Sequence, residues 1–448
     1  MNIGRCTAWL GKKIATMQSL RTCAWLAATT LLSAQMSAIP KSMQAEQATS
    51  APGFVDSIGV QTHISYVDTP YAHWQRVMNE LNRLGVHHVR DALPTTPTFI
   101  PEHRQLEAAG IRCTCGVTTD EKLSAGDIVH AARAAGDVEA LEAPNECDAG
   151  SNCGGGGQKG IARATAILPI LARAADELHV PLIGPSFTTA EAYASAGSIA
   201  QWVNYNNLHV YFGGRNPGTD GWGAGDRAGH RYGSFDWWMD QSKVNAPGAP
   251  SQITETGYEA FDNPSRAGTI PADVESAYLL RTLLLAWNHG SSRTFIYELL
   301  DEFPGSGYGL LRNDMSEKPA FKALRNLIAL LNESSETVTP RPLDLTLGGD
   351  DPTLSHTLLQ EADGSYFLIL WLERSGYDIL TLHKILVPTE SIHVALGGGF
   401  GVRDIVSFDG DGSTLESNLS TTPSSLNVRV SDRLNVLHIV PHRSTGDE

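Results

Sequence analysis

The feature that most constrains the fold is an alternation, from Ser57 to about Leu331, of short apolar or β-branched runs with longer segments of helical periodicity. The runs that we interpret as strands cover residues 58–63, 88–91, 112–117, 140–146, 182–186, 207–212, 251–256 and 294–299. Helical patterns include residues 72–84, 161–178, 272–288 and 318–331. Eight such units in about 275 residues predict parallel strands in a (β/α)8 TIM barrel of the α/β class. A doubly wound sheet is the alternative, but residues 61–65 do not form its glycine-rich phosphate loop.

The pattern changes after residues 337–342, which have the proline content of a linker. Helical periodicity disappears, and short strands alternate with turns such as Asp363-Gly364. The expected strands are residues 354–360, 366–372, 391–396, 402–407, 425–430 and 436–440. This predicts a small antiparallel β-sandwich, so we divide the chain into a barrel at residues 53–333 and a sandwich at residues 338–445.

Residues 1–38 have the layout of a secretory signal peptide. The segment contains four basic residues and no acidic one, then an apolar run at residues 23–32, then small residues ending near Ala38. Met17 is an alternative start that gives a signal of more usual length. A single membrane anchor is the other interpretation, but the apolar run is short for a membrane span. We therefore expect export, with the protein secreted or periplasmic.

The charge balance narrows the possible partners. Loss of the four basic residues of the signal takes the formal net charge from −16 to −20. Such an acidic surface repels nucleic acid and anionic lipid. No later apolar stretch approaches the roughly 20 residues of a membrane span, so no membrane contact is expected after signal removal. A neutral polysaccharide is compatible with this charge.

Four cysteines remain in the mature chain, and an oxidising compartment permits disulfides. Cys147 and Cys153 bracket a polar loop, and we expect them to form a disulfide. Cys113 and Cys115 lie two residues apart on one expected strand, so they share a face and are interpreted as packing residues. No histidine has ligand spacing near them, and no metal site is predicted from the sequence.

Two glutamates carry the chemical argument. Glu146 and Glu255 each close a short apolar run and are followed by a glycine-containing loop. The C-terminal ends of barrel strands converge on one mouth, so both carboxylates are expected to face each other there. Cleavage of a glycosidic bond needs one carboxylic acid with a raised pKa and one ionised carboxylate, about 5 Å apart in a retaining enzyme. The alternative is that each is an ordinary surface glutamate.

Further residues at the expected strand ends match a known family. They are Asn145 before Glu146, Arg90 on the second strand, His209 and Tyr211 on the sixth, and the segment 309–320. This ordered set resembles the retaining glycoside hydrolases of clan A, and the trailing sandwich is similar to that of family 39. The resemblance implies that Glu146 is the acid/base, Glu255 the nucleophile, Asn145 a partner of the sugar 2-hydroxyl, and Tyr211 a holder of the nucleophile.

The chain departs from the family at the eighth strand. Many clan members have a tryptophan there as the floor of the sugar site, whereas this chain has Tyr297-Glu298. Either residue is a candidate for part of that role. His63, at the end of the first strand, is a candidate sugar contact or an interior imidazole.

Three other side chains have alternative interpretations. Arg90 is expected to orient the nucleophile, with an ion pair to Asp91 as the alternative. Glu142 has the strand parity of Glu146 and is interpreted as a buried structural residue. Trp222, in the glycine-rich loop 213–234, is the first candidate for an aromatic platform under a sugar ring.

The sequence therefore predicts an exported retaining glycoside hydrolase that acts on an oligo- or polysaccharide and needs no cofactor. Two alternatives keep the same cleft, namely a non-catalytic carbohydrate-binding protein and a transglycosylase that uses the same glutamates. The sandwich is expected to be a structural accessory, with direct carbohydrate binding as the alternative. The sugar, the linkage, exo or endo action, and the oligomeric state stay open.

Overall fold

The computed structural model describes residues 43–119, 122–150, 152–332 and 338–442. The expected signal peptide, residues 1–38, lies outside this part of the chain. In the described part, no helix has both the length and the apolar character that a membrane crossing requires.

Eight parallel strands form the predicted barrel, in the order β7-β6-β5-β4-β3-β12-β9-β8. Their bounds are β3 Ile58–Gln61, β4 His88–Ala92, β5 Arg112–Gly116, β6 Val138–Glu142, β7 Leu182–Ile183, β8 Asn206–Val210, β9 Ser251–Thr256 and β12 Ser291–Ile296. A parallel bridge between Ile183 and Tyr205 joins the two ends of this sheet. The (β/α)8 prediction is thereby confirmed.

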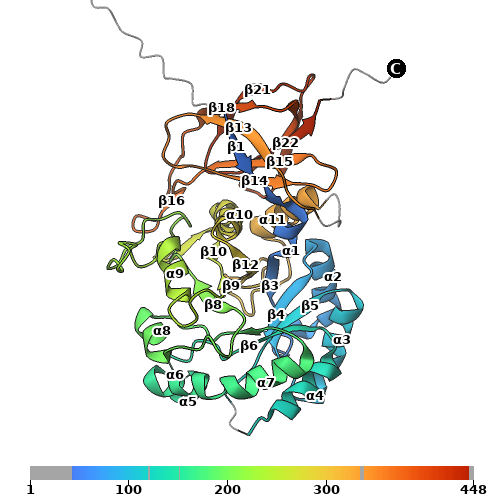
Figure 1. Cartoon of the computed structure of the whole chain (residues 1–448), viewed down its shortest axis with the longest axis vertical. Coiled ribbons are helices and arrows are strands. Elements are labelled where there is room, and N and C mark those ends of the chain that lie inside the picture. Colours follow the sequence, from blue (N-terminus) through green and yellow to red (C-terminus); the bar gives the residue numbers. More distant parts are fainter. Residues whose placement is uncertain (1–42, 120–121, 151, 333–337, 443–448) are drawn as a thin grey trace, which may run out of the picture. The chain divides into compact units, whose positions relative to one another are not determined.

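Helices surround these strands (Figure 1). They are α1 Ala51–Asp56, α2 Trp74–Leu84, α3 Ile100–Ala108, α4 Ala125–Ala135, α5 Asn152–Gly155, α6 Gly157–Ala166, α7 Leu168–Leu178, α8 Ala190–Ala196, α9 Phe235–Ser242, α10 Ala272–Asn288 and α11 Pro319–Leu331, with short 3-10 turns at Pro70–Ala72 and Pro97–Phe99. The single helix predicted at residues 161–178 is wrong, because two helices meet there. The second has a proline in its first turn, a position where the missing N–H removes no helical hydrogen bond.

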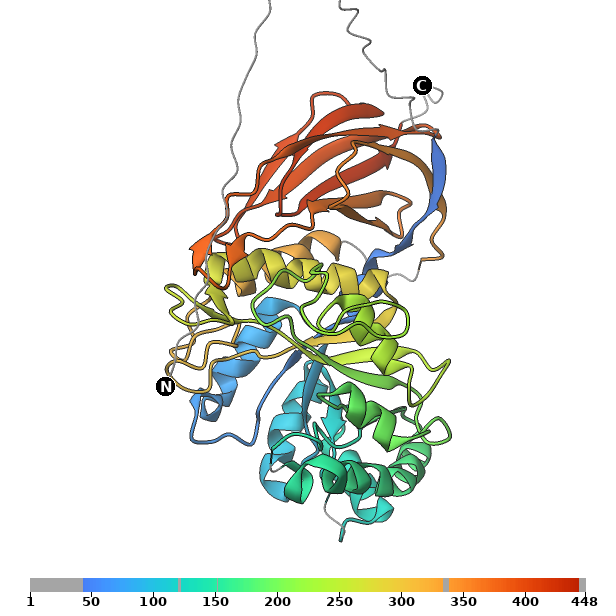
Figure 2. The same ribbon diagram turned by 90° about the vertical axis from the view of Figure 1, so that its left-hand side faces the viewer.

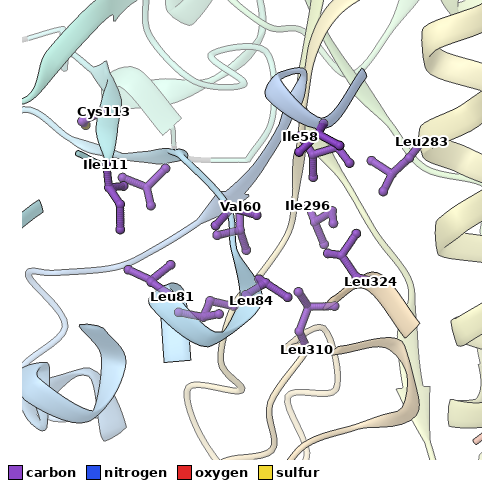
Figure 3. Close-up of a cluster of buried hydrophobic side chains, with 14 of the residues drawn as sticks. Ile58, Val60, Leu81, Leu84, Ile111, Cys113, Leu283, Ile296, Leu310 and Leu324 are labelled. Atoms are coloured by element: carbon purple, nitrogen blue, oxygen red, sulfur yellow. The ribbon is translucent and has the colours of Figure 1, made fainter. Parts of the chain in front are cut away.

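Apolar side chains from strands and helices meet between the barrel wall and its outer layer. Ile58, Val60 and Ile296 of neighbouring strands are at most 1% exposed and pack with leucines of α2, α10 and α11 (Figure 3). The interior of the barrel is also filled. A Cβ atom on Gly59 would lie 2.4 Å from the Phe295 ring, so a larger residue at position 59 would displace that ring. This packing gives the mouth a rigid base.

Two sheets form the predicted sandwich, in the orders β1-β13-β18-β21 and β2-β14-β15-β22-β19-β20. The strands are β1 Gln44–Gln47, β2 Thr49–Ser50, β13 Pro342–Gly348, β14 Leu354–Gln360, β15 Tyr366–Leu372, β18 Glu390–Leu396, β19 Phe400–Phe408, β20 Thr414–Asn418, β21 Ser425–Val430 and β22 Asn435–Pro441. Two further pairs of short strands are β10 Glu259–Phe261 with β11 Thr269–Pro271, and β16 Tyr377–Asp378 with β17 His383–Lys384.

The N-terminal strands belong to this sandwich, although the sequence analysis assigned residues 44–50 to neither domain. β1 pairs antiparallel with β13, and β2 pairs parallel with β14. Figures 1 and 2 both show β1, in blue, beside the orange and red strands of the sandwich. The sandwich is thus built from two chain segments, one before the barrel in the sequence and one after it.

A buried ion pair links the barrel to the sandwich. The fully buried Arg281 of α10 donates to Glu373, which follows β15. Glu373 also accepts hydrogen bonds from the Asn216 side chain and the Gly218 backbone N–H, in the loop after β8. A sandwich residue therefore fixes the start of the long loop that follows a strand of the mouth.

Candidate active site

Of the two glutamates at the barrel mouth, one lies on a strand and the other on a loop. Glu255 lies in β9, as predicted. Glu146 does not end a strand, because β6 ends at Glu142 and Glu146 lies on the following loop with φ 44°. The predicted strand 140–146 is therefore too long. Pro144 has no N–H to donate to a strand ladder, which accounts for the early end.

His209 of β8 brings the two carboxylates together. Its Nδ1 atom lies 2.8 Å from Glu146 Oε1 and 3.3 Å from Glu255 Oε2. One side-chain atom from each of the three residues lies within 4.8 Å of the other two. The prediction that the glutamates face each other is confirmed, and their separation is close to the roughly 5 Å of a retaining pair.

Glu255 is held by two more donors. Arg90 Nη1 donates to its Oε1 atom at 2.6 Å, and the Tyr211 hydroxyl donates to its Oε2 atom at 3.0 Å. Of the two alternatives for Arg90, the structure has the contact with Glu255, whereas Asp91 accepts from the Thr62 hydroxyl and the Ile64 N–H. Hydrogen bonds from a guanidinium to a carboxylate are strong and fix its orientation.

Glu142 is the buried structural acid that the sequence predicts. It is 0% exposed and accepts two hydrogen bonds from Arg90, at 2.6 and 2.9 Å. The amide of Asn207 also donates to it, at 3.0 Å. Arg90 Nη2, one of the two nitrogens that donate to Glu142, also donates to Asn145 Oδ1 at 2.8 Å. Arg90 thus connects the buried acid, the nucleophile candidate and Asn145.

Glu146 has a different environment from the one expected for an acid catalyst. Burial by itself raises the pKa of Glu146, but its hydrogen bond with His209 and the positive charges of His209 and Arg90 outweigh burial, so its pKa lies below the ordinary value. The expectation of a raised pKa at the acid is wrong for this residue, because His209 is its direct hydrogen-bond partner.

The hydrogen bonds around His209 indicate that its Nε2 atom carries a proton. The Thr254 hydroxyl has one hydrogen and lies against two acceptors, Asn207 Oδ1 at 2.7 Å and Glu142 Oε1 at 3.0 Å. It therefore accepts from His209 Nε2, which lies 3.1 Å away. With Nε2 protonated, the contact between Nδ1 and Glu146 contains one further proton. Glu146 and His209 therefore share one proton, which either residue can carry.

A cavity of about 510 Å³ lies over these groups. Predicted residues that line it are His63, Arg90, Asn145, Glu146, Glu255 and Tyr297. Trp222 is not among them. The Arg215 guanidinium covers its indole, 4.3 Å from the ring centroid, and the backbone N–H of Trp222 donates to the Tyr232 backbone carbonyl. The interpretation of Trp222 as a platform in this cavity is therefore wrong, because its loop folds back on itself.

The sequence analysis missed other aromatic side chains near the cavity. Tyr66 lines the cavity and stacks on His63, with ring centroids 4.4 Å apart and planes 10° apart. Tyr308 packs edge-on against Tyr211 and Tyr297. Tyr66 closely follows the end of the first barrel strand, so its position in the sequence could have marked it as a residue of the mouth. No comparable signal marks Tyr308.

Tyr297 and Glu298 occupy different positions in the site. Tyr297 lines the cavity, whereas Glu298 is 1% exposed behind it. Burial, together with the charge of Asp301, raises the pKa of Glu298 to about 8. His63 Nε2 lies 3.2 Å from Glu298, and burial lowers the pKa of His63. Of the two candidates for the missing tryptophan, Tyr297 therefore has the position of a floor residue.

The four cysteines in the described part of the chain form two pairs. Cys147 and Cys153 are bonded, as predicted, and Cys153 lines the cavity. Cys113 and Cys115 are fully buried, as expected of packing residues, but they are also bonded to each other. His103 lies near them in space, although it does not have ligand spacing to them in the sequence. The helix α3 brings it there, which the sequence spacing does not reveal.

No protein-family model and no curated protein matches the chain. Solved structures do match. A family 39 glycoside hydrolase from Bacteroides cellulosilyticus WH2 has a TM-score of 0.59 at 15% identity, over 88% of this chain and 82% of the other. A monomeric β-xylosidase from Caulobacter crescentus CB15 has a TM-score of 0.57 at 14% identity, over 89% and 98%. The catalytic domain of GH30 xylanase C from Talaromyces cellulolyticus has a TM-score of 0.53 at 10% identity, over 90% and 99%. The chain thus has the fold of these proteins, one of which is a family 39 glycoside hydrolase, as its resemblance to that family implied.

Proposed function

We propose that the chain is an exported retaining glycoside hydrolase that cleaves O-glycosidic bonds by double displacement. One observation carries the proposal. The carboxylates of Glu146 and Glu255 both contact His209 Nδ1, at 2.8 and 3.3 Å, in a cavity at the mouth of the barrel. Two carboxylates at this separation suit attack on a sugar by one and protonation of the leaving group by the other.

In the first step, Glu255 attacks the anomeric carbon and forms a covalent glycosyl-enzyme. Arg90 and Tyr211 hold this carboxylate in one orientation. The bond from the anomeric carbon to the leaving oxygen breaks, and that oxygen takes the proton held between Glu146 and His209. The pair supplies the proton even though the pKa of Glu146 is lowered in the unliganded site, because its proton is shared across a 2.8 Å contact.

In the second step, Glu146 takes a proton from water, and the resulting hydroxide equivalent attacks the anomeric carbon. The bond to Glu255 breaks, its carboxylate is restored, and the sugar leaves with retained configuration. Asn145 is suited to hold the 2-hydroxyl group. Its Oδ1 atom accepts from Arg90, which leaves its amide hydrogens for the sugar.

The substrate class follows from the charges of the cavity. Among the described residues that line it, Arg90 is the only lysine or arginine, and it is bound to Glu142 and Glu255. No free lysine or arginine side chain is left among these lining residues for a uronic acid carboxylate, so the preferred sugar is neutral. Two of the similar structures are a β-xylosidase and a xylanase, which makes β-xylosides the first compounds to test.

The experiment is a screen of the mature protein against aryl β-glycosides and neutral β-glycans, with Glu255→Gln as the matched variant. We expect hydrolysis by the wild type and a loss of roughly 10,000-fold or more in the variant. A carbohydrate-binding protein would instead retain its ligand affinity in the variant and show no hydrolysis in either form. Products that carry a new glycosidic bond at high acceptor concentration would indicate a transglycosylase. Sequencing the N-terminus of the exported protein tests cleavage near Ala38.

A further inference from the structure

A second cluster of ligating side chains lies beside the proposed catalytic pair. His63, Glu298 and Glu302, here called the His63 cluster, come from the loops after β3 and β12, which are neighbours in the barrel. His63 Nε2 lies 3.2 Å from Glu298 Oε2 and 3.5 Å from Glu302 Oε1. One atom from each of the three lies within 4.8 Å of the other two.

The polar atoms of the His63 cluster are poorly satisfied by the protein. Glu298 is 1% exposed, yet neither of its carboxylate oxygens makes a hydrogen bond of ordinary geometry, although Ser306 lies close by. The Nε2 atom of His63 is also buried without such a bond. Buried polar atoms are paired in most proteins, and an unpaired one destabilises the fold. These atoms point to a missing partner with positive charge.

The separations of the ligating atoms identify the kind of partner. Zinc binds histidine nitrogen and carboxylate oxygen at about 2.0–2.2 Å in tetrahedral sites, which puts neighbouring ligand atoms about 3.4 Å apart. The 3.2 and 3.5 Å distances from His63 Nε2 bracket this value. Calcium suits the cluster less well, because it prefers six to eight oxygen ligands at longer distances.

Other groups with the same residue types are better satisfied, although Asp226 Oδ2 also lacks a hydrogen-bond partner. In the Glu146, His209 and Glu255 group, Arg90, Tyr211 and Thr254 supply hydrogen bonds. The sulfurs of Cys113 and Cys115 are bonded to each other. In the group of Asp226, His230 and Asp240, the histidine donates to Asp240 at 2.8 Å and its side chain is 40% exposed. The His63 cluster differs from all three because its most buried member has no such partner.

We propose that the His63 cluster binds one divalent cation of the zinc type, with His63, Glu298 and Glu302 as protein ligands. A dication balances the charges of the two carboxylates, and a neutral imidazole completes the donor set. His63 lines the cavity and the Glu302 side chain is 17% exposed, so the ion has access from solvent. An open position on the ion then faces the cavity, where water or a sugar hydroxyl completes the coordination. This inference does not depend on hydrolytic activity.

The test measures Zn²⁺ binding directly. Untagged mature protein is treated with chelator, dialysed, and titrated with ZnCl₂ by calorimetry, and bound zinc is counted by elemental analysis. We expect about one Zn²⁺ per chain and a melting temperature that rises with ZnCl₂, because an ion that binds the folded state stabilises it. Glu302→Gln and His63→Asn should each weaken binding by at least about tenfold.

Asp240→Asn is the matched control, because it alters a histidine and carboxylate group of the same composition at an exposed position. It should leave the affinity unchanged. The proposal is overturned if the wild type binds no zinc, if both cluster variants bind as tightly as the wild type, or if Asp240→Asn removes the ion. Circular dichroism of the variants checks that each is folded, and Glu302→Gln, at a partly exposed position, retains a test of the proposal even if His63→Asn does not fold.

Discussion

The two ends of the barrel each contain a cluster of charged side chains, and β4 contributes to both. At the mouth, Arg90 joins Glu142 and Glu255. At the opposite end, His88, two residues earlier on the same strand, contacts Glu139 at 2.9 Å and Asp56 at 3.0 Å. The same kinds of side chain are therefore present at both ends.

The clusters differ in how completely their charges are matched. At the opposite end, Arg293 adds a second basic partner for both acids, and the Asp56 side chain is 63% exposed. None of these residues lines the catalytic cavity. At the mouth, one arginine serves two carboxylates, and Glu146 and Glu255 face the cavity. An excess of acid over one cavity is costly for folding and useful for chemistry, whereas a matched cluster serves stability.

The largest expected difference between the ends is in catalysis. Glu146→Ala should lower kcat/KM for unactivated glycosides by roughly 100- to 10,000-fold, because general acid catalysis contributes about that much. Substrates with a dinitrophenyl leaving group need no proton and should lose far less in glycosyl-enzyme formation. Glu139→Ala at the opposite end is the control, with kcat/KM expected to stay within about twofold. Equal losses for both leaving groups would contradict the role of Glu146 as the acid.

The next difference is in stability. Arg90→Met leaves the fully buried Glu142 without its ion pair and should lower the free energy of unfolding by about 3–5 kcal/mol. Arg293→Met removes a partly exposed cation, and the acids it leaves behind can reach water or His88, so the loss should be about 1 kcal/mol or less. Urea unfolding followed by circular dichroism measures both. Similar losses would mean that the two clusters are equivalent in the fold.

A smaller effect is expected at Tyr211. Tyr211→Phe removes the hydroxyl that donates to Glu255 at 3.0 Å and keeps the ring that packs against Tyr308. A hydrogen bond to a charged group is worth about 1.5–3 kcal/mol, so kcat should fall roughly 10- to 100-fold with little change in the melting temperature. Tyr308→Phe is the matched control, because it keeps the aromatic contact. An unchanged kcat in Tyr211→Phe would mean that Arg90 alone orients the nucleophile.

Much of the architecture follows from local sequence patterns. Two short runs on either side of the Asp363-Gly364 turn predicted the β14–β15 hairpin with the bounds that the structure has. The N-terminal strands escaped prediction because residues 44–47 contain three polar residues and one alanine and so have no apolar period, and because their partner strand follows the whole barrel in the sequence. Pairing of that kind is decided by tertiary contacts.

The residues of the site likewise divide into those that the local sequence predicts and those that depend on tertiary contacts. Position at a strand end, together with the resemblance to clan A, predicted Glu255, Arg90, His209 and Tyr211 at one mouth. Loop residues were less predictable. Trp222 is held outside the cavity by contacts within its own loop, and Glu302 approaches His63 only because β3 and β12 are neighbours in the closed sheet. No local pattern in the sequence contains that information.

The smallest expected effect is a change in pH dependence at the mouth alone. The pKa of Glu146 is lowered by its hydrogen bond with His209 and by positive charge, while burial acts in the opposite direction. His209→Asn removes the larger lowering contribution, so the pKa of Glu146 should rise. Because the protonated acid is the active form, the alkaline limb of kcat/KM should then move to higher pH. His230→Asn, in an exposed histidine and carboxylate pair, should leave the limb in place. A limb that stays fixed in His209→Asn, or that moves to lower pH, would show that His209 does not share the catalytic proton.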